Sequence, residues 1–361
     1  MKATKGMSRR SFLGLCGVAG IGAAAALAGC GGSGDSKTAA TTEAATTGAT
    51  TSSYEPATLR VAFMPNIGSA GTLFAGIDQG YFEEVGITVE PQQFQAGPAE
   101  ITAMASGDID VAQIGHGAHS LAIQGQAKIF SFEQLSKADE VVANKSKGIN
   151  SAADLKGKTV GVSSGTSSEA ILLLVLEKAG LTKDDITTVE MDVSGMTTAL
   201  ISGQIDAAAT WSPNTVTLKN QLGDNYLMLG TDTDFSDQVA FPGSYCCNPD
   251  YASKNKELLV RFAAALDKAK VYRAEHIDDV AKLLASKLDL PEETLLQSTG
   301  EGDWQGAVDA IGKVDVIEGY YKAQQKVFID AGKVEKEVPV TDYVMTDVIE
   351  EADKLYADKL K

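Results

Sequence analysis

Cysteine, histidine and arginine are scarce in this sequence, and each shortage removes a class of site. The 361 residues include 4 cysteines and 3 histidines. No zinc-type spacing occurs among them, so we expect no metal site. Beyond residue 29, arginine occurs only at Arg60, Arg261 and Arg273. A site that holds its ligand through arginine side chains is therefore not expected.

Basic residues are also in deficit. The chain has 31 Lys+Arg against 48 Asp+Glu, and four of the basic residues and none of the acids fall within residues 1–29. The remaining chain therefore has 27 basic and 48 acidic residues, a net charge of −21. Such an acidic surface argues against binding to nucleic acid and against electrostatic adhesion to anionic lipid.

No hydrophobic run is long enough to span a membrane comfortably. The apolar, uncharged stretch near the start, from Phe12 to Leu27, has only 16 residues, whereas a spanning helix needs about 20. It follows Lys2, Lys5, Arg9 and Arg10 and ends in small residues. A basic start, a short apolar segment and small residues at its end are typical of a secretory signal peptide, which we assign to residues 1–29.

Two motifs refine this assignment. Ser8–Leu13 resembles a twin-arginine export signal. Leu27-Ala28-Gly29-Cys30 resembles the bacterial lipobox, in which the cysteine is acylated and becomes the new N-terminus. Residues 30–57 are mostly Gly, Ser, Thr and Ala and predict a disordered tether. We therefore expect an exported protein, anchored through lipid on Cys30 to the outer face of the bacterial cytoplasmic membrane.

The remaining length, about 300 residues, predicts two lobes of α/β type. Short β-rich runs alternate with helical patterns, which is typical of parallel strands joined by helices. Expected strands are 59–63, 87–90, 110–114, 159–162, 186–190 and 206–210, and expected helices are 70–79, 99–106, 168–179, 197–202, 256–272, 280–286 and 314–329. Cys246 and Cys247 would point to opposite faces of a strand as small buried residues, with a vicinal disulfide as the alternative.

One pattern occurs twice. Ala103–Ala112 and Ala199–Ala208 both contain Ser-Gly-x-Ile-Asp-x-Ala, which fits a helix that ends at glycine and a strand entered through Ile-Asp. The repetition favours two similar lobes. Two α/β lobes leave a cleft at the carboxyl ends of their strands, where such sheets bind ligands.

The loops expected at this cleft are rich in small and hydroxyl-bearing residues. Ser163–Ser168 joins a strand to a helix, and exposed N–H groups at such a helix start bind anions without a basic side chain. Ordinary N-capping by one Ser or Thr is the simpler explanation. Met64–Ser69, Phe94–Pro98, Gly115–His119 and Thr210–Pro213 lie at corresponding places. We expect His116 to meet a ligand, His119 to be structural, and Phe241-Pro242-Gly243 to act as a hinge.

These residues resemble a known family. Tyr81-Phe82-Glu83, Ala103–Ala112, Asp154–Lys158 and Ile205–Pro213 are similar to segments of the nitrate/sulfonate/taurine family of periplasmic binding proteins, in order over about residues 58–330. The resemblance implies a two-lobed type II binding-protein fold, with residues 58–134 and 243–361 in one lobe and 135–242 in the other.

The resemblance also implies a function. It predicts the non-enzymatic solute-binding component of an ABC importer, which captures a small anionic solute such as a sulfonate, taurine or nitrate and docks on a permease. We expect a monomer without a cofactor. Carried over by position, the ligand-binding residues are Asn66, Gln95, Gly97, His116, Gly165, Thr166, Ser167 and Trp211.

Two enzymatic alternatives remain open at this point. Gly161–Gly165 satisfies the G-x-S-x-G pattern of a hydrolase, with Ser163 as nucleophile, but the only downstream histidine is His276, in a helix-rich region. The second alternative is a pyrimidine-forming enzyme on the same fold. An external lipid anchor argues against it.

Overall fold

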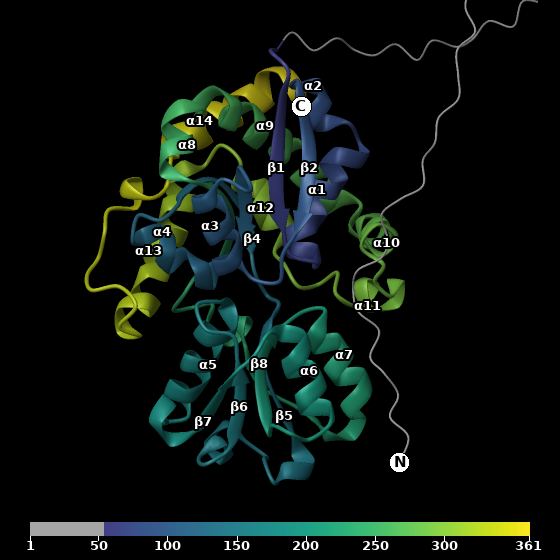
Figure 1. Ribbon diagram of the computed structural model, residues 1–361, viewed down its shortest axis with the longest axis vertical. Helices are drawn as coiled ribbons and strands as arrows, with labels where there is room; N and C mark the ends of the chain where they lie inside the picture. The colour runs from purple at the N-terminus through teal and green to yellow at the C-terminus, as the bar shows by residue number, and fades with distance from the viewer. Residues whose placement is uncertain (1–53) are drawn as a thin grey trace, which may run out of the picture. The chain divides into compact units, whose positions relative to one another are not determined.

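The computed structural model describes residues 54–361, which contain two five-stranded sheets (Figure 1). The first sheet has the order β2-β1-β3-β10-β4 and the second β7-β6-β8-β5-β9. The strands are β1 Ala57–Phe63, β2 Ile87–Gln93, β3 Val111–Ile114, β4 Lys128–Leu135, β5 Asp139–Asn144, β6 Thr159–Val162, β7 Thr187–Glu190, β8 Ala207–Trp211, β9 Tyr226–Thr231 and β10 Pro242–Cys247. Each sheet is the centre of one lobe, as the predicted α/β two-lobed fold requires.

Helices cover both faces of each sheet. The α-helices are α1 Ile67–Asp78, α2 Tyr81–Glu84, α3 Gly97–Ser106, α4 His119–Ile123, α5 Ser167–Lys178, α6 Val193–Ile201, α7 Asn214–Leu222, α8 Pro249–Lys254, α9 Lys256–Glu275, α10 Ile277–Leu288, α11 Glu292–Gln297, α12 Trp304–Asp309, α13 Val314–Asp330 and α14 Thr346–Leu355. In the second lobe α5 lies on one face of the sheet and α6 and α7 on the other (Figure 1). None of the helices in the described part of the chain is both long and apolar enough to cross a membrane.

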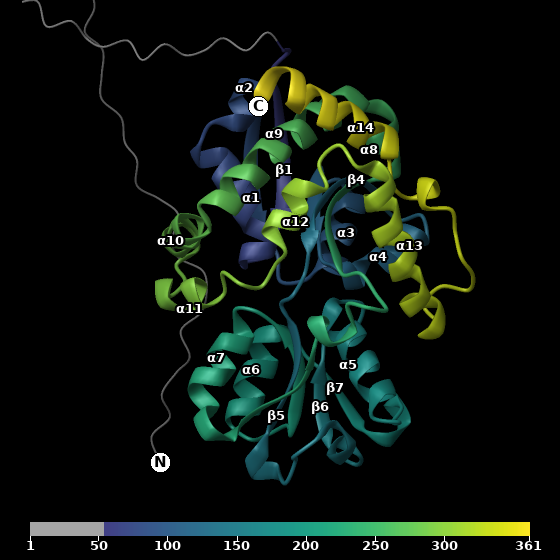
Figure 2. The ribbon, with the colours of Figure 1, turned by 180° about the vertical axis from the view of Figure 1, so that it is seen from behind.

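The first lobe has one hydrophobic core on each face of its sheet. Helices α1, α9, α10 and α14 pack on one face, and α3, α4 and α13 on the other (Figure 2). The two cysteines mark these faces, because Cys247 belongs to the first core and Cys246 to the second. Both are free and buried, which confirms that they are small core residues rather than a vicinal disulfide.

The sheets are mixed, so the expectation of parallel strands alone is wrong. Strand β10 is antiparallel to both β3 and β4, and β5 is antiparallel to both β8 and β9. Each of these two strands enters its sheet directly from the other lobe, and no α-helix intervenes to reverse the chain. A strand that arrives in this way runs against its neighbours.

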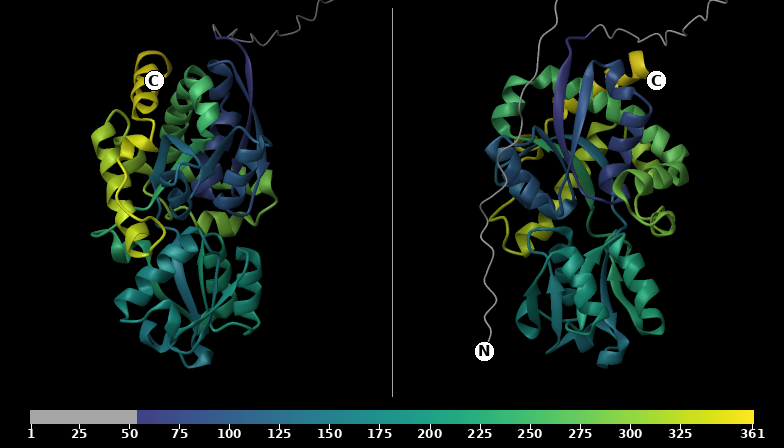
Figure 3. Two further views of the ribbon diagram at one scale, coloured as in Figure 1. Left: turned by 60° about the vertical axis from the view of Figure 1, so that its left-hand side comes forward. Right: turned by 45° about the vertical axis from the view of Figure 1, so that its right-hand side comes forward.

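Two crossovers join the lobes (Figure 3). The first runs from the end of β4 at Leu135 to the start of β5 at Asp139, and the second from the end of β9 at Thr231 to the start of β10 at Pro242. Phe241-Pro242-Gly243, predicted as a hinge, therefore lies where the second crossover enters the sheet. The residue boundaries predicted for the lobes remain predictions, and the predicted signal, tether and Cys30 lie outside the described residues.

Candidate functional site

A cavity of about 70 Å³ lies between the lobes, at the carboxyl ends of β1, β3, β6 and β8. It is lined by Met64, Asn66, Gly68, Ser69, Gly97, Gln113, Gly115, His116, Ala118, Gln134, Ser136, Ala138, Asp139, Thr166, Ser167, Trp211, Ser212, Gly243 and Glu301. At roughly 10–15 Å³ for each water, the cavity holds about five waters. This is room for a small solute and not for a peptide or an oligosaccharide.

Three helices begin at this cavity. Helix α1 is capped by Asn66, whose side chain accepts a hydrogen bond from the N–H of Ser69 at 2.8 Å. Helix α5 is capped by Thr166, which accepts one from the N–H of Ser168 at 3.2 Å, and helix α3 starts at Gly97. Each helix start contributes a partial positive charge, so the three together favour an anionic group in the cavity.

The lobes touch beside the cavity, at Gly117. A Cβ atom on Gly117 would lie 2.0 Å from the carbonyl carbon of Thr166 and 2.2 Å from the nitrogen of Ser167. Only a glycine lets the backbone after β3 approach the start of α5 this closely. The structure is therefore a closed arrangement of the lobes, with the first lobe in backbone contact with the Ser/Thr loop of the second.

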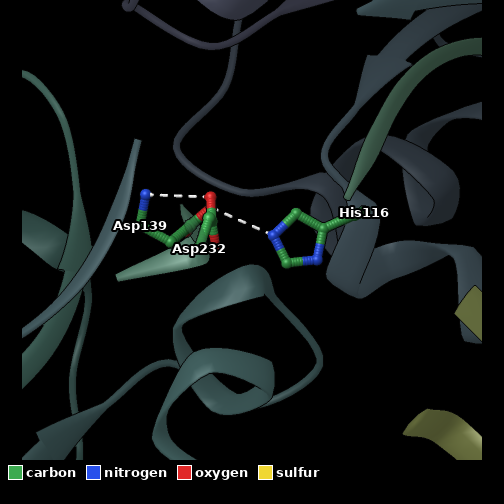
Figure 4. A group of neighbouring side chains, drawn as sticks. All are labelled: His116, Asp139 and Asp232. Carbon is green, nitrogen blue, oxygen red and sulfur yellow. Dashed lines mark hydrogen bonds and ion pairs between the residues drawn. The ribbon is translucent and has the colours of Figure 1, made fainter. Parts of the chain in front are cut away.

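A buried group of three titratable side chains borders the cavity where the first crossover enters the second lobe (Figure 4). Nε2 of His116 lies 3.0 Å from Oδ2 of Asp139, and the backbone N–H of Asp139 donates to Oδ2 of Asp232 at 3.3 Å. The hydroxyl of Ser136 lies 3.1 Å from the carboxylate of Asp139 and 3.0 Å from that of Asp232. The group thus connects both lobes and both crossovers.

Asp139 and Asp232 differ in how strongly each carboxyl group holds a proton. Burial and the neighbouring charge of Asp139 raise the pKa of Asp232 well above its usual range. Burial alone would also raise the pKa of Asp139, but the facing His116 and hydrogen bonds from His116 and Ser167 outweigh it and leave the pKa lowered. A proton held by this pair therefore resides preferentially on Asp232, and Asp139 is the more readily ionised of the two.

The same three side chains are the only potential metal-ligand cluster among residues 54–361, with ligand atoms within 4.8 Å of one another. The acidic members, Asp139 and Asp232, lie at the ends of the crossovers, so the spacing of His116 and His119 could not reveal them. The hydrogen bond between His116 and Asp139 already joins the nitrogen to a carboxylate. We therefore interpret the cluster as a hydrogen-bonded network.

Six of the eight predicted ligand residues line the cavity: Asn66, Gly97, His116, Thr166, Ser167 and Trp211. His116 differs from the expectation in one respect, because its ring is held by Asp139 and packs edge-on against Phe241 at 5.0 Å. His119 is structural as predicted: it is fully buried and lies 2.8 Å from Oε1 of Gln324.

Gln95 and Gly165 do not line the cavity. Gln95 is exposed at the end of the segment after β2. Gly165 has a φ of +73° and donates its N–H to the carboxylate of Glu169 at 2.9 Å. The left-handed turn and this hydrogen bond direct Gly165 towards a separate shallow pocket beside α13. We therefore exclude both residues from the site.

Sequence reasoning missed five polar residues of the lining: Gln113, Gln134, Ser136, Asp139 and Glu301. Glu301 belongs to a loop between α11 and α12, and it is hydrogen-bonded to Ser212 and Ser298. Burial raises the pKa of Glu301 to about 8. None of the 19 lining residues is a lysine or an arginine.

Ser163, the candidate nucleophile, lies outside the cavity lining. Its N–H donates to the hydroxyl of Ser168 at 3.1 Å, and its carbonyl accepts from the hydroxyl of Thr166 at 2.6 Å. His276 belongs to the first lobe, where it caps α10 and packs against Tyr272. The residues of this G-x-S-x-G segment thus shape a turn, and the hydrolase alternative has no support.

Residues 68–279 match the family model described as NMT1/THI5 like. This match spans more than half of the chain and both lobes. The protein belongs to the NMT1/THI5-like family. The resemblance inferred from the sequence motifs is confirmed, because named relatives bind sulfonates or taurine.

Curated relatives cover most of the chain at modest identity. A putative binding protein of Brucella abortus is 28% identical over 293 residues, which are 80% of this chain and 90% of the relative. A putative aliphatic sulfonates-binding protein of Bacillus subtilis is 26% identical over 300 residues, 79% of this chain and 85% of the relative. The taurine-binding periplasmic protein of Escherichia coli is 27% identical over 240 residues, which are 65% of this chain and 72% of the relative.

Solved structures confirm the fold. The alkanesulfonate-binding protein SsuA of Xanthomonas axonopodis pv. citri, bound to MOPS, has a TM-score of 0.63 and 21% identity over 80% of this chain and 98% of its own. The desulfurization enzyme DSZB has a TM-score of 0.62 and 18% identity over 82% of this chain and 98% of its own. The second case shows that this fold can also carry an enzyme.

Proposed function

We propose that this protein is the extracytoplasmic solute-binding component of an ABC importer and that it captures a small sulfonate-type solute. The observation that carries the proposal is the cavity of about 70 Å³ between two lobes, with three helix starts around it. The binding functions named for the relatives support the same class of solute. The solute leaves unchanged, so the protein is not an enzyme.

In this proposal the helix starts hold the sulfonate oxygens. The N–H groups at the starts of α1, α3 and α5 supply hydrogen bonds, and Trp211 forms an apolar wall for the carbon chain. The lobes separate to admit the solute and close over it by bending at the crossovers. The closed form docks on a permease, while lipid on Cys30 keeps the monomeric protein at the membrane.

Calorimetry on the purified protein tests this function. We expect heat of binding from taurine or a short alkanesulfonate and no change in the recovered solute by NMR. Thr166→Val with Ser167→Ala removes the hydroxyl that caps α5 and a hydroxyl of the cavity lining, and a hydrogen bond to a charged group contributes about 1.5–3 kcal/mol. We therefore expect at least a tenfold loss of affinity.

Two further variants isolate the cause. Ser167→Ala alone keeps the Thr166 cap of α5, so any loss of affinity is not a loss of the helix start. Thr198→Val with Ser202→Ala removes hydroxyls that bond only to the backbone of α6, and we expect unchanged affinity. Unchanged affinity in the Thr166/Ser167 variant would exclude this loop from the site, and turnover of the solute would contradict a pure binding function.

A further inference from the structure

The cavity has an acidic side that a simple anion does not explain. Its lining contains two carboxyl groups, Asp139 and Glu301, and no lysine or arginine. The only basic side chain of the lining, His116, is already hydrogen-bonded to Asp139. A ligand that is negative throughout would therefore meet carboxyl groups as well as the helix starts.

Several buried hydrogen-bond acceptors of this lining have no partner. Oε1 of Gln113, Oε1 of Gln134 and Oδ1 of Asp139 are buried and form no hydrogen bond within residues 54–361. The exposed fractions of these three residues are 2%, 5% and 2%. An unpartnered buried acceptor is destabilising by about 1–3 kcal/mol, so a ligand that brings N–H donors would recover this free energy on binding.

Two glycines leave room beside the glutamines. Gln113 comes from β3 and Gln134 from β4, and Gly243 of β10 lies between these strands. A Cβ on Gly243 would lie 2.9 Å from Nε2 of Gln134 and 3.2 Å from Nε2 of Gln113, and one on Gly68 would lie 3.0 Å from Nε2 of Gln134. The absence of both Cβ atoms keeps the two amides accessible from the cavity.

We propose that the captured solute carries a protonated amino group or a similar N–H-rich nitrogen group, which the carboxyl groups of Glu301 and Asp139 bind together with the glutamine oxygens. This inference rests on the proposed function, which places the anionic end of the solute at the helix starts. The solute is thus a zwitterion such as an aminoalkanesulfonate, in preference to a plain sulfonate or nitrate.

The sign of the pH dependence distinguishes this solute from a plain anion. Burial raises the pKa of Glu301 to about 8, with Ser212 and Ser298 as its hydrogen-bond partners and the charges of Glu140 and Asp139 nearby. Lys137 donates its backbone N–H to the carbonyl of Glu301, but its side chain pairs with Asp303 instead. A bound cation favours the ionised form of Glu301, so Glu301 releases a proton when the cation binds. The affinity for a cationic ligand therefore rises from pH 6 to pH 8. A bound anion favours the protonated carboxyl, so its affinity falls.

The test compares taurine with ethanesulfonate by calorimetry on the full chain at pH 6 and pH 8. Ethanesulfonate has the same two-carbon chain and sulfonate but lacks the terminal nitrogen. We expect taurine to bind at least tenfold more tightly, with the difference growing at pH 8. Glu301→Gln keeps the size of the side chain but cannot become negative, and it should abolish most of this difference. Glu292→Gln, an exposed site at the start of α11, is the matched control and should retain it.

Each other outcome has a definite meaning. Equal binding of the two sulfonates, or an affinity for taurine that falls as the pH rises, would overturn the nitrogen site and leave the proposed function intact. Binding of 2-aminoethanol without either sulfonate would support the nitrogen site and overturn the sulfonate assignment. No binding by any of the three compounds would overturn both.

Discussion

Glu100 is a buried carboxyl group whose ionisation the fold disfavours. It lies in helix α3, fully buried, and neither of its carboxylate oxygens has a hydrogen-bond partner within the described chain. Burial raises the pKa of this carboxyl group well above its usual range. The native protein therefore favours the protonated form of Glu100 more strongly than the unfolded chain does.

This difference predicts how stability depends on pH. Because the native carboxyl binds its proton more tightly, the contribution of Glu100 to stability is fully present below the unfolded pKa and is lost as the pH rises towards the native pKa. Glu100→Gln removes the ionisation, so its melting temperature should fall less between pH 5 and pH 9 than that of the wild type. Scanning calorimetry measures this, and Glu90→Gln on the exposed part of β2 should behave like the wild type. Parallel curves for Glu100→Gln and wild type would contradict a neutral Glu100.

Residues of the site differed in how far the sequence revealed them. Asn66 and Thr166 were predicted because each follows a recognisable strand and caps the next helix, so local pattern determines their place. Glu301 had no such signal. Its loop reaches the cavity through contacts distant in sequence, such as the hydrogen bond from the N–H of Lys137 to its carbonyl at 2.9 Å. Tertiary packing alone places Glu301 at the site.

Strands and helices show the same division at the level of elements. Strand β6 was predicted at its observed bounds, and β1, β3, β7 and β8 to within one or two residues, because each belongs to a local strand–helix unit. Strands β4, β5, β9 and β10 were missed. They follow the crossovers or precede them, and no helix of regular pattern marks their ends. The predicted parallel arrangement failed at β5 and β10 for this reason.

Gly117 links an element to function, because it sets how closely the loop after β3 approaches helix α5. A methyl group there would lie 2.0 Å from the carbonyl carbon of Thr166, so backbone of one lobe would have to move away from the other. Gly117→Ala should therefore keep the lobes apart and weaken solute binding at least tenfold, while each lobe remains folded. Calorimetry gives the affinity, and small-angle scattering with solute gives the radius of gyration.

A glycine outside the contact provides the control for this variant. Gly319 is exposed in helix α13, and an added Cβ would meet no atom within 4 Å. Gly319→Ala should leave both affinity and radius unchanged. If Gly117→Ala bound the solute as the wild type does and closed to the same radius, the close contact at Thr166 would not govern closure.

For the whole molecule, closure also brings charges of the two lobes together. Glu169 of α5 is 4% exposed and pairs with Lys183 at 2.8 Å and with Lys333 at 2.9 Å. Lys333 follows α13, which packs on the first lobe, so this second pair connects the lobes. Burial would raise the pKa of Glu169, but the hydrogen bonds from Lys183, Gly165 and Lys333 outweigh it and lower the pKa to about 2.

Lys333→Met should therefore favour the open form. An exposed ion pair contributes about 0.2–1 kcal/mol, so we expect a solute affinity up to about fivefold weaker at low salt. High salt should reduce the difference from the wild type, because it screens the charge of Lys333. Lys326→Met is the matched control, since Lys326 pairs with Asp330 within α13 and crosses no lobe boundary. A loss of affinity that is the same in both variants, or that persists in high salt, would show that net charge or packing, and not the pair with Glu169, controls closure.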